Sequence, residues 1–112
     1  MPRAVGMSQA IRLALTGEKI DADTALSIGL VHKVVPADRL QAEAHDFATN
    51  LAGLPTQAIA LTKRIFIESS GLSLAQAMDR EAEVQDQAAA TEDHLEGVLA
   101  FLQKRTPSFI GR

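Results

Sequence analysis

Hydrophobic residues recur at spacings of three and four along most of the chain, a pattern typical of helices with one buried face. The clearest stripe consists of Leu40, Ala44, Phe47, Ala48 and Leu51. The same spacing predicts helices over residues 2–17, 21–29 and 56–71, one that begins at Ser73, and a final amphipathic helix over residues 91–105. The pattern therefore predicts a mainly α chain.

Polar residues mark the starts of these helices. Asp21, Asp38 and Thr91 each precede an apolar periodic segment, where a side-chain oxygen can accept a hydrogen bond from a free N–H of the first turn. Ser73 and Gln76 have the spacing of a capping box, in which the two residues satisfy each other's backbone N–H groups. These caps support the helix boundaries that the hydrophobic spacing suggests.

One segment does not follow the helical pattern. The apolar run from Leu30 to Val35, closed by Pro36, predicts one short strand near residues 30–35. A single strand cannot form a sheet by itself. Either Val31–Val35 pairs with a strand outside this sequence, or it is an extended connector with water on one side.

Composition narrows the class of protein. A chain of 112 residues has room for one modest core, so residues 1–112 are expected to form one structural unit. A net charge of −3 gives no cationic field for a nucleic acid, and the absence of cysteine excludes disulfides and thiolate metal sites. No apolar run is long enough to cross a bilayer, so we expect no membrane partner and a cytoplasmic location.

The residues alone predict no catalytic group and no metal site. The three histidines, His32, His45 and His94, are too far apart in sequence to form a helical metal-binding pair. No glycine motif has the spacing of a phosphate-binding loop. The carboxylates of the helix that begins at Ser73 are typical of a solvated face, and no nucleophile motif is present.

Three stretches, however, resemble one family in their order and spacing. They are LTGEKIDADTALSIGLVHKVVP (residues 15–36), LPTQAIALTKRIF (54–66) and TEDHLEGVLAFLQKRTPSFIG (91–111). Together they cover nearly the whole chain and are similar to the carboxy-terminal region of the enoyl-CoA hydratase/isomerase family, the crotonases. The last stretch carries the pattern T-x-D-x-x-E-G-x-x-A-F-x-x-K-R.

The resemblance implies a ClpP/crotonase-like α/β fold, in which an amino-terminal spiral of β-β-α units builds the active site. A helical region such as this one covers that site and builds trimers or dimers of trimers. In the family, the oxyanion-hole N–H groups and the proton-transferring carboxylates come from segments upstream of the stretch that matches residues 2–6. We therefore expect no catalytic residue in these 112 residues, and the chain alone to be inactive.

The implied reaction of the intact enzyme is the hydration of a 2-enoyl-CoA through a thioester enolate, a lyase or isomerase activity of fatty acid metabolism. Isomerase, dehydratase, hydrolase and decarboxylase relatives share this region, so the resemblance does not choose among them. It implies acyl-CoA as the substrate and no covalently bound cofactor. A second hypothesis is a noncatalytic helical oligomerisation module from a truncated crotonase paralogue. In both cases, exposed apolar helix faces should drive self-association.

The resemblance also nominates two residues for contact with coenzyme A (CoA). In relatives, the lysine at the position of Lys104 lies near the phosphates or adenine of CoA, often the CoA of a neighbouring subunit, and Phe101 belongs to the same motif. A lysine can follow a phosphate as a mobile point charge. The alternative is that Lys104 and Arg105 only complement the negative end of the final helix dipole.

Three positions bear on whether this region contacts CoA. Phe101 is grouped by helical spacing with His94 and Val98, which favours core or subunit packing for its ring. Gln85 stands where some relatives carry an aromatic residue against the adenine, and an amide lacks that stacking surface. Lys63 has no visible partner and is interpreted as a solvated side chain.

Overall fold

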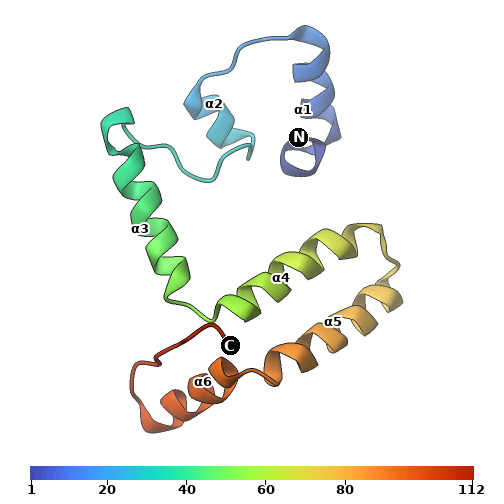
Figure 1. Cartoon of the computed structure of the whole chain (residues 1–112). Helices are drawn as coiled ribbons and strands as arrows, with labels where there is room; N and C mark the ends of the chain where they lie inside the picture. Colours follow the sequence, from blue (N-terminus) through green and yellow to red (C-terminus); the bar gives the residue numbers. More distant parts are fainter. The chain divides into compact units, whose positions relative to one another are not determined.

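The computed structural model describes all 112 residues and contains six α-helices and two short 3₁₀ turns, with no β-strand (Figure 1). The mainly α prediction is therefore confirmed. The chain divides into two compact units, residues 1–43 and residues 44–112, rather than the single unit that its length suggested.

The first unit begins with helix α1 (Pro2–Thr16), which has proline in its first turn, where a missing N–H does no harm. Gly6 interrupts the helix with a φ of +78°, and Gly17 ends it in the left-handed conformation. Helix α2 (Ala22–Ser27) follows, and its cap is the predicted one, because Asp21 accepts the N–H of Thr24 at 2.8 Å. That hydrogen bond lowers the pKa of Asp21.

The predicted strand near residues 30–35 is not formed. Residues 32–36 are extended or bent, and Val31 donates its N–H to Ala25 O at the end of α2. A strand exists only when a second strand accepts and donates its ladder hydrogen bonds. No other extended segment of this chain pairs with it, so the hydrophobic run alone was not sufficient.

Helix α3 (Leu40–Ala52) starts in the first unit and continues in the second. Asp38 is not its cap, because residues Ala37–Arg39 form a 3₁₀ turn (η1) that leads directly into the helix. Glu43, in the first turn of α3, instead pairs with Lys33 at 2.5 Å and with Arg39 at 2.7 Å. The hydrogen bond from Lys33 is the main reason that the pKa of Glu43 is lowered.

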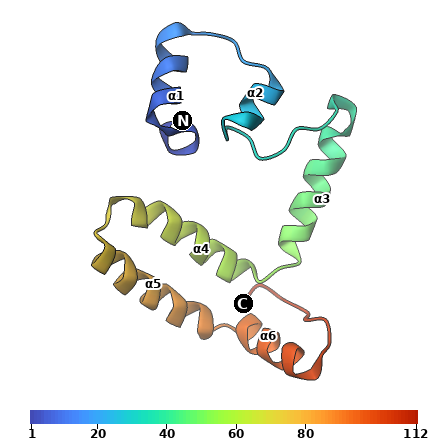
Figure 2. The same cartoon turned by 180° about the vertical axis from the view of Figure 1, so that it is seen from behind.

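Helices α4 (Thr56–Glu68) and α5 (Leu74–Ala89) form an antiparallel pair joined by the 3₁₀ turn Ser69–Gly71 (Figures 1 and 2). The predicted capping box starts α5: Ser73 Oγ accepts the N–H of Gln76, and the Gln76 side chain accepts the N–H of Ser73 at 3.0 Å. This arrangement fixes the turn between the two helices.

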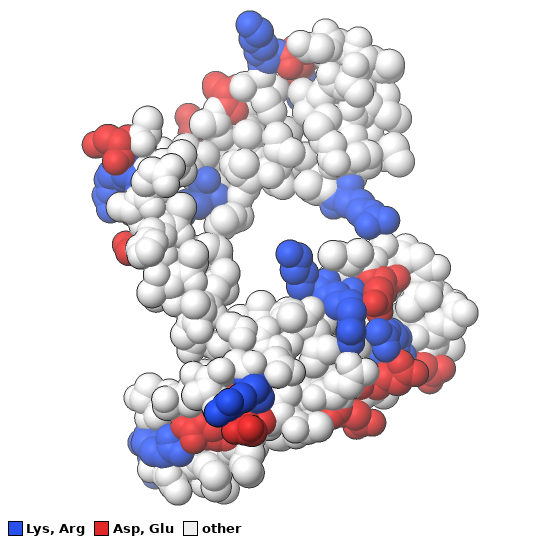
Figure 3. All heavy atoms as spheres, in the orientation of Figure 1, with Lys and Arg blue, Asp and Glu red and all other residues white.

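One ion pair and one side-chain hydrogen bond join α4 to α5. Arg80 donates to Glu68 at 2.7 Å across the pair and to Glu83 at 2.7 Å on its own helix. Arg64 of α4 donates to the side chain of Gln87 at 2.8 Å. Basic and acidic groups accordingly lie next to one another over this pair of helices (Figure 3), and surface pairs of this kind contribute little stability individually.

Buried hydrophobic residues are few. Ala10, Val84 and Ala100 are the buried hydrophobic residues of the chain. The stripe predicted over residues 40–51 is exposed throughout, and Leu74 and Met78, expected on the buried face of α5, are exposed as well. The sequence pattern identified these apolar faces, but nothing within the chain covers them.

Helix α6 (Glu92–Gln103) packs against α5 and begins, as predicted, with Thr91, whose Oγ1 accepts the N–H of His94 at 3.1 Å. Residues 104–112 then form a tail without regular secondary structure. No helix of the structure combines the length and the hydropathy that crossing a membrane requires.

Candidate functional site

The end of helix α6 has an unusual backbone. Lys104 is the one non-glycine residue of the chain with a positive φ, at φ 53° and ψ 38°. Its N–H donates to Phe101 O at 3.2 Å, and the N–H of Arg105 donates to Ala100 O at 3.0 Å, which is the hydrogen-bond pattern of a Schellman motif. Glycine usually occupies this position, because the left-handed conformation costs other residues about 1–2 kcal/mol. A lysine here is therefore held against its backbone preference.

The two adjacent cations have different surroundings. Arg105 binds Glu96 with both terminal nitrogens, Nη1 to Oε1 at 2.6 Å and Nη2 to Oε2 at 2.7 Å. The Lys104 side chain is exposed, and its ammonium forms no hydrogen bond or ion pair. Of the two cations, only Lys104 is free to bind a ligand.

Glu96 is an acceptor for the backbone as well. Its Oε1 accepts the N–H of Ser108 at 2.7 Å. The hydrogen bonds from Arg105, and then the one from Ser108, lower the pKa of Glu96 to about 2, and the same contact raises the pKa of Arg105. The carboxylate is thus ionised at any physiological pH and ties the tail to the middle of α6.

A second carboxylate ties the tail to the start of α6. Asp93 is 2% exposed, and its two oxygens accept the N–H groups of Ile110 at 2.7 Å and Gly111 at 2.9 Å. The N–H of Asp93 donates in turn to Arg112 O at 2.9 Å. Gly111 has a φ of +79°, and a Cβ on it would lie 2.7 Å from Thr56 Oγ1 of α4, so the tail approaches α4 too closely for a side chain.

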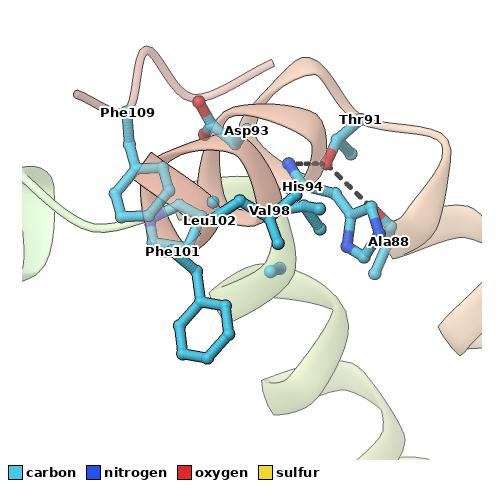
Figure 4. A pocket seen from close by; sticks show the side chains of 11 residues that line it. Ala88, Thr91, Asp93, His94, Val98, Phe101, Leu102 and Phe109 are labelled. Carbon is cyan, nitrogen blue, oxygen red and sulfur yellow. Dashed lines mark hydrogen bonds between the residues drawn. The ribbon is translucent and has the colours of Figure 1, made fainter. Parts of the chain in front are cut away.

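A groove of about 410 Å³ lies between α4, the end of α5, α6 and this tail. Its walls are mostly apolar and are formed by Pro55, Ala58, Ala88, Thr91, Asp93, His94, Gly97, Val98, Phe101, Leu102 and Phe109. Figure 4 shows the Phe101 ring projecting away from α6, with Phe109 on the tail. We call this the α6 groove.

The structure brings the predicted neighbours of Phe101 together, but not as a core. His94 and Val98 line the α6 groove with it, whereas Phe101 itself is 83% exposed. Its interpretation as a core residue of this chain is therefore wrong. Subunit packing and ligand contact, the other interpretations of its ring, both need an exposed surface.

Two positions considered in the sequence lie elsewhere. Gln85 is exposed on α5 and does not line the α6 groove. Lys63 lines a shallower groove on α4 together with Phe66 and Ile67. Neither residue belongs to the site around Lys104.

Asp93 and Glu96 were not identified from the sequence. Both are acidic residues early in a helix, and this placement is usually explained by the helix dipole. Their spacing of three residues in the motif T-x-D-x-x-E-G was the available signal, because it places both carboxylates on one side of the helix. The segment that they bind is 12 to 18 residues further along the chain.

Comparison with known proteins gives a consistent result. The family model described as enoyl-CoA hydratase/isomerase matches residues 1–112. The 2,3-dehydroadipyl-CoA hydratase of Escherichia coli is 39% identical over 110 residues, which cover 98% of this chain and 43% of that protein. The 1,2-epoxyphenylacetyl-CoA isomerase of the same organism is 35% identical over 112 residues, 100% of this chain and 43% of that protein.

A solved structure extends the match to three dimensions. The enoyl-CoA hydratase of Bacillus anthracis superposes with a TM-score of 0.90 at 33% identity, over 99% of this chain and 43% of that one. The chain thus spans less than half the length of the relatives that it matches.

Proposed function

Because this chain belongs to the enoyl-CoA hydratase/isomerase family, as its motifs predicted, we propose that it is the CoA-contacting part of an enzyme that hydrates a 2-enoyl-CoA. Its mainly α structure corresponds to the helical carboxy-terminal region of that fold, as expected from the sequence. In this proposal the reaction passes through a thioester enolate, with acyl-CoA as substrate and no covalently bound cofactor. The groups that stabilise the enolate and transfer protons lie outside these 112 residues, so none of the residues described is catalytic.

The free ammonium of Lys104 is the observation that carries the proposal. Lys104 follows two residues that line the α6 groove, Phe101 and Leu102, and its turn is closed by backbone hydrogen bonds, while the neighbouring Arg105 is neutralised by Glu96. The phosphates of CoA need a cation that no carboxylate already occupies. Lysine meets this need as a point charge on a flexible stem and makes no demand for the planar geometry of a guanidinium.

Phe101 completes the proposed contact. Its exposed ring, three residues before Lys104, offers an apolar surface at the groove. An aromatic face can pack on a nucleobase or on the pantetheine chain of CoA. Binding of a nucleotide in this way would cover a ring that is otherwise in water.

Lys104→Ala in the native gene product tests this function. A lost charge-assisted hydrogen bond of about 1.5 kcal/mol should weaken CoA binding roughly tenfold in a calorimetric titration. Lys63→Ala removes an exposed cation outside the α6 groove and should leave the CoA affinity unchanged. Equal affinity of the Lys104→Ala variant and the parent would remove Lys104 from the binding site.

The exposed apolar faces favour a second candidate, a noncatalytic helical module that assembles with copies of itself or with a longer relative. Leu15, Leu74 and Phe101 are each more than three-quarters exposed, at 81%, 78% and 83%. Large exposed apolar residues mark surfaces that other protein covers. Light scattering and a crotonyl-CoA assay on the 112-residue chain test this candidate, which requires association without turnover. A compact monomer at high concentration would contradict it, and so would turnover at an enzymatic rate.

A further inference from the structure

We propose that Glu96 is a positioning residue for Lys104, because its contacts with Arg105 and Ser108 hold the left-handed turn that presents the lysine ammonium. The inference rests on the proposed function, since it concerns how the same cation is directed towards a phosphate. It adds a residue to the site that does not itself touch the ligand.

The contacts enclose Lys104 from both sides. On the helical side, its own N–H donates to Phe101 O. On the tail side, Arg105 is fixed to Glu96 by two parallel hydrogen bonds, and its Nε donates to the side chain of Gln103 at 2.7 Å. The residues immediately before and after Lys104, Gln103 and Arg105, are therefore joined to each other and, through Glu96, to the helix about two turns earlier.

These contacts explain how a lysine can occupy a left-handed position. A Schellman turn with glycine forms without strain, whereas lysine at φ 53° needs surrounding contacts that outweigh its preference for other conformations. The contact of Arg105 with Glu96 is the strongest polar contact of the tail next to this turn. Both partners are charged, and two parallel hydrogen bonds join them. Without it, only the two backbone hydrogen bonds of the motif oppose the return of Lys104 from the left-handed region to the conformations that lysine prefers.

The ion pair also sets the charge at this end of α6. Glu96 and Arg105 neutralise each other, so the net charge presented by this end of α6 is that of Lys104. Loss of Arg105 would leave Glu96 as an unpaired anion on this helix, and loss of Glu96 would leave Arg105 as a second unpaired cation. The ion pair thus restricts phosphate recognition to one cation in one place.

A double-mutant cycle in the native gene product tests the inference, with CoA as the ligand and calorimetry as the measurement. Lys104→Ala and Glu96→Ala should each weaken binding about tenfold, and the double variant should be no weaker than Lys104→Ala alone. Lys104→Ala should lower the salt dependence of CoA binding, because it removes a cation, whereas Glu96→Ala should not lower it, because Lys104 keeps its charge and Arg105 loses its partner. Glu92→Ala, at an exposed position of the same helix, is the matched control and should bind like the parent.

The outcomes separate the two proposals. An unchanged affinity in Lys104→Ala overturns the CoA contact of Lys104 that the proposed function assigns. A tenfold loss in Lys104→Ala with no loss in Glu96→Ala overturns the positioning role, and so does a double variant that shows the product of the two single effects. Should Glu96→Ala fail to fold, Glu96→Gln takes its place. Glutamine keeps the shape of the side chain and one acceptor oxygen for the Ser108 N–H, and it weakens only the contact with Arg105.

Hydrogen exchange tests the inference without CoA. The N–H groups of Lys104 and Arg105 are both bonded in this turn. In Glu96→Ala their exchange should accelerate at least tenfold, whereas Glu92→Ala should leave it unchanged. Unaltered exchange at these amides in Glu96→Ala would show that the turn holds without Glu96 and would overturn the inference directly.

Discussion

Replacing Asp93 by asparagine should release the end of the tail from the start of α6. The side chain of Asp93 is buried, and each of its two oxygens accepts one backbone N–H, from Ile110 and from Gly111. Asparagine has nearly the same shape but only one acceptor oxygen, and its NH₂ group would face an N–H donor. The substitution therefore removes one hydrogen bond and the negative charge while leaving the packing volume almost unchanged.

The magnitude follows from the type of hydrogen bond that is lost. A bond to a charged group contributes about 1.5–3 kcal/mol, and a donor left without a partner in a buried place adds to the loss. With a tenfold change for every 1.4 kcal/mol, local opening of the tail should become roughly 10 to 150 times more frequent. The first turn of α6 also loses an anion that its dipole favours, which acts in the same direction.

Amide hydrogen exchange measures this opening directly. The N–H groups of Ile110 and Gly111 should lose protection by the factor given above, while amides in the middle of α5 keep theirs. Glu92→Gln removes a charge one residue earlier, where the pair with Arg112 is long, at 3.8 Å, and solvent-exposed, so it should change little. Unchanged protection in Asp93→Asn, or an equal loss in Glu92→Gln, would refute the role given to the buried carboxylate.

Three other outcomes are expected. Lys104→Gly should raise the stability by about 1 kcal/mol in urea unfolding, because glycine adopts the left-handed conformation without strain, while CoA binding weakens; a lower urea midpoint would contradict the strain. The pKa of Glu96 is lowered to about 2 from 4.5, so its stabilising effect is complete above pH 4.5 and is lost as the pH falls towards 2; parent and Glu96→Gln should therefore converge in stability over that window, and parallel pH profiles would contradict this. Gly111→Ala should destabilise the protein more than Gly6→Ala does, because both glycines have nearly the same φ, +79° and +78°, but only the Cβ at position 111 would meet another atom, Thr56 Oγ1 at 2.7 Å; equal losses in the urea midpoint for the two variants would refute the close contact.

Local features of the fold could be predicted because their partners are close in sequence. The caps at Asp21, Ser73 and Thr91 each bind an N–H three residues later, so the motif contains the whole interaction. The strand near residues 30–35 could not be settled in this way, since its formation depends on a partner. The apolar stripe of α3 could also be predicted, because its spacing is a local pattern. Its burial could not be predicted, because burial depends on what packs against the helix.

The site was predictable only in part. The resemblance nominated Lys104 and Phe101 and left out Arg105, but the sequence offered no physical reason why Lys104 is the free cation and Arg105 the paired one. That distinction depends on Glu96, nine residues earlier than Arg105, and on a tail whose course no periodicity describes. The role of Asp93 was hidden for the same reason, because a buried acceptor for two peptide groups looks in sequence like an ordinary first-turn acid.

The way in which Asp93 holds the tail determines how freely the tail can vary. The carboxylate binds the peptide N–H of Ile110 and does not depend on the isoleucine side chain, which is 56% exposed. Position 110 should therefore tolerate substitution by polar, charged or small residues in a saturation library, with proline as the exception because it has no N–H to donate. Position 93 should accept almost nothing but aspartate, so the most permissive and the most restrictive sites of this region are the two ends of one hydrogen bond.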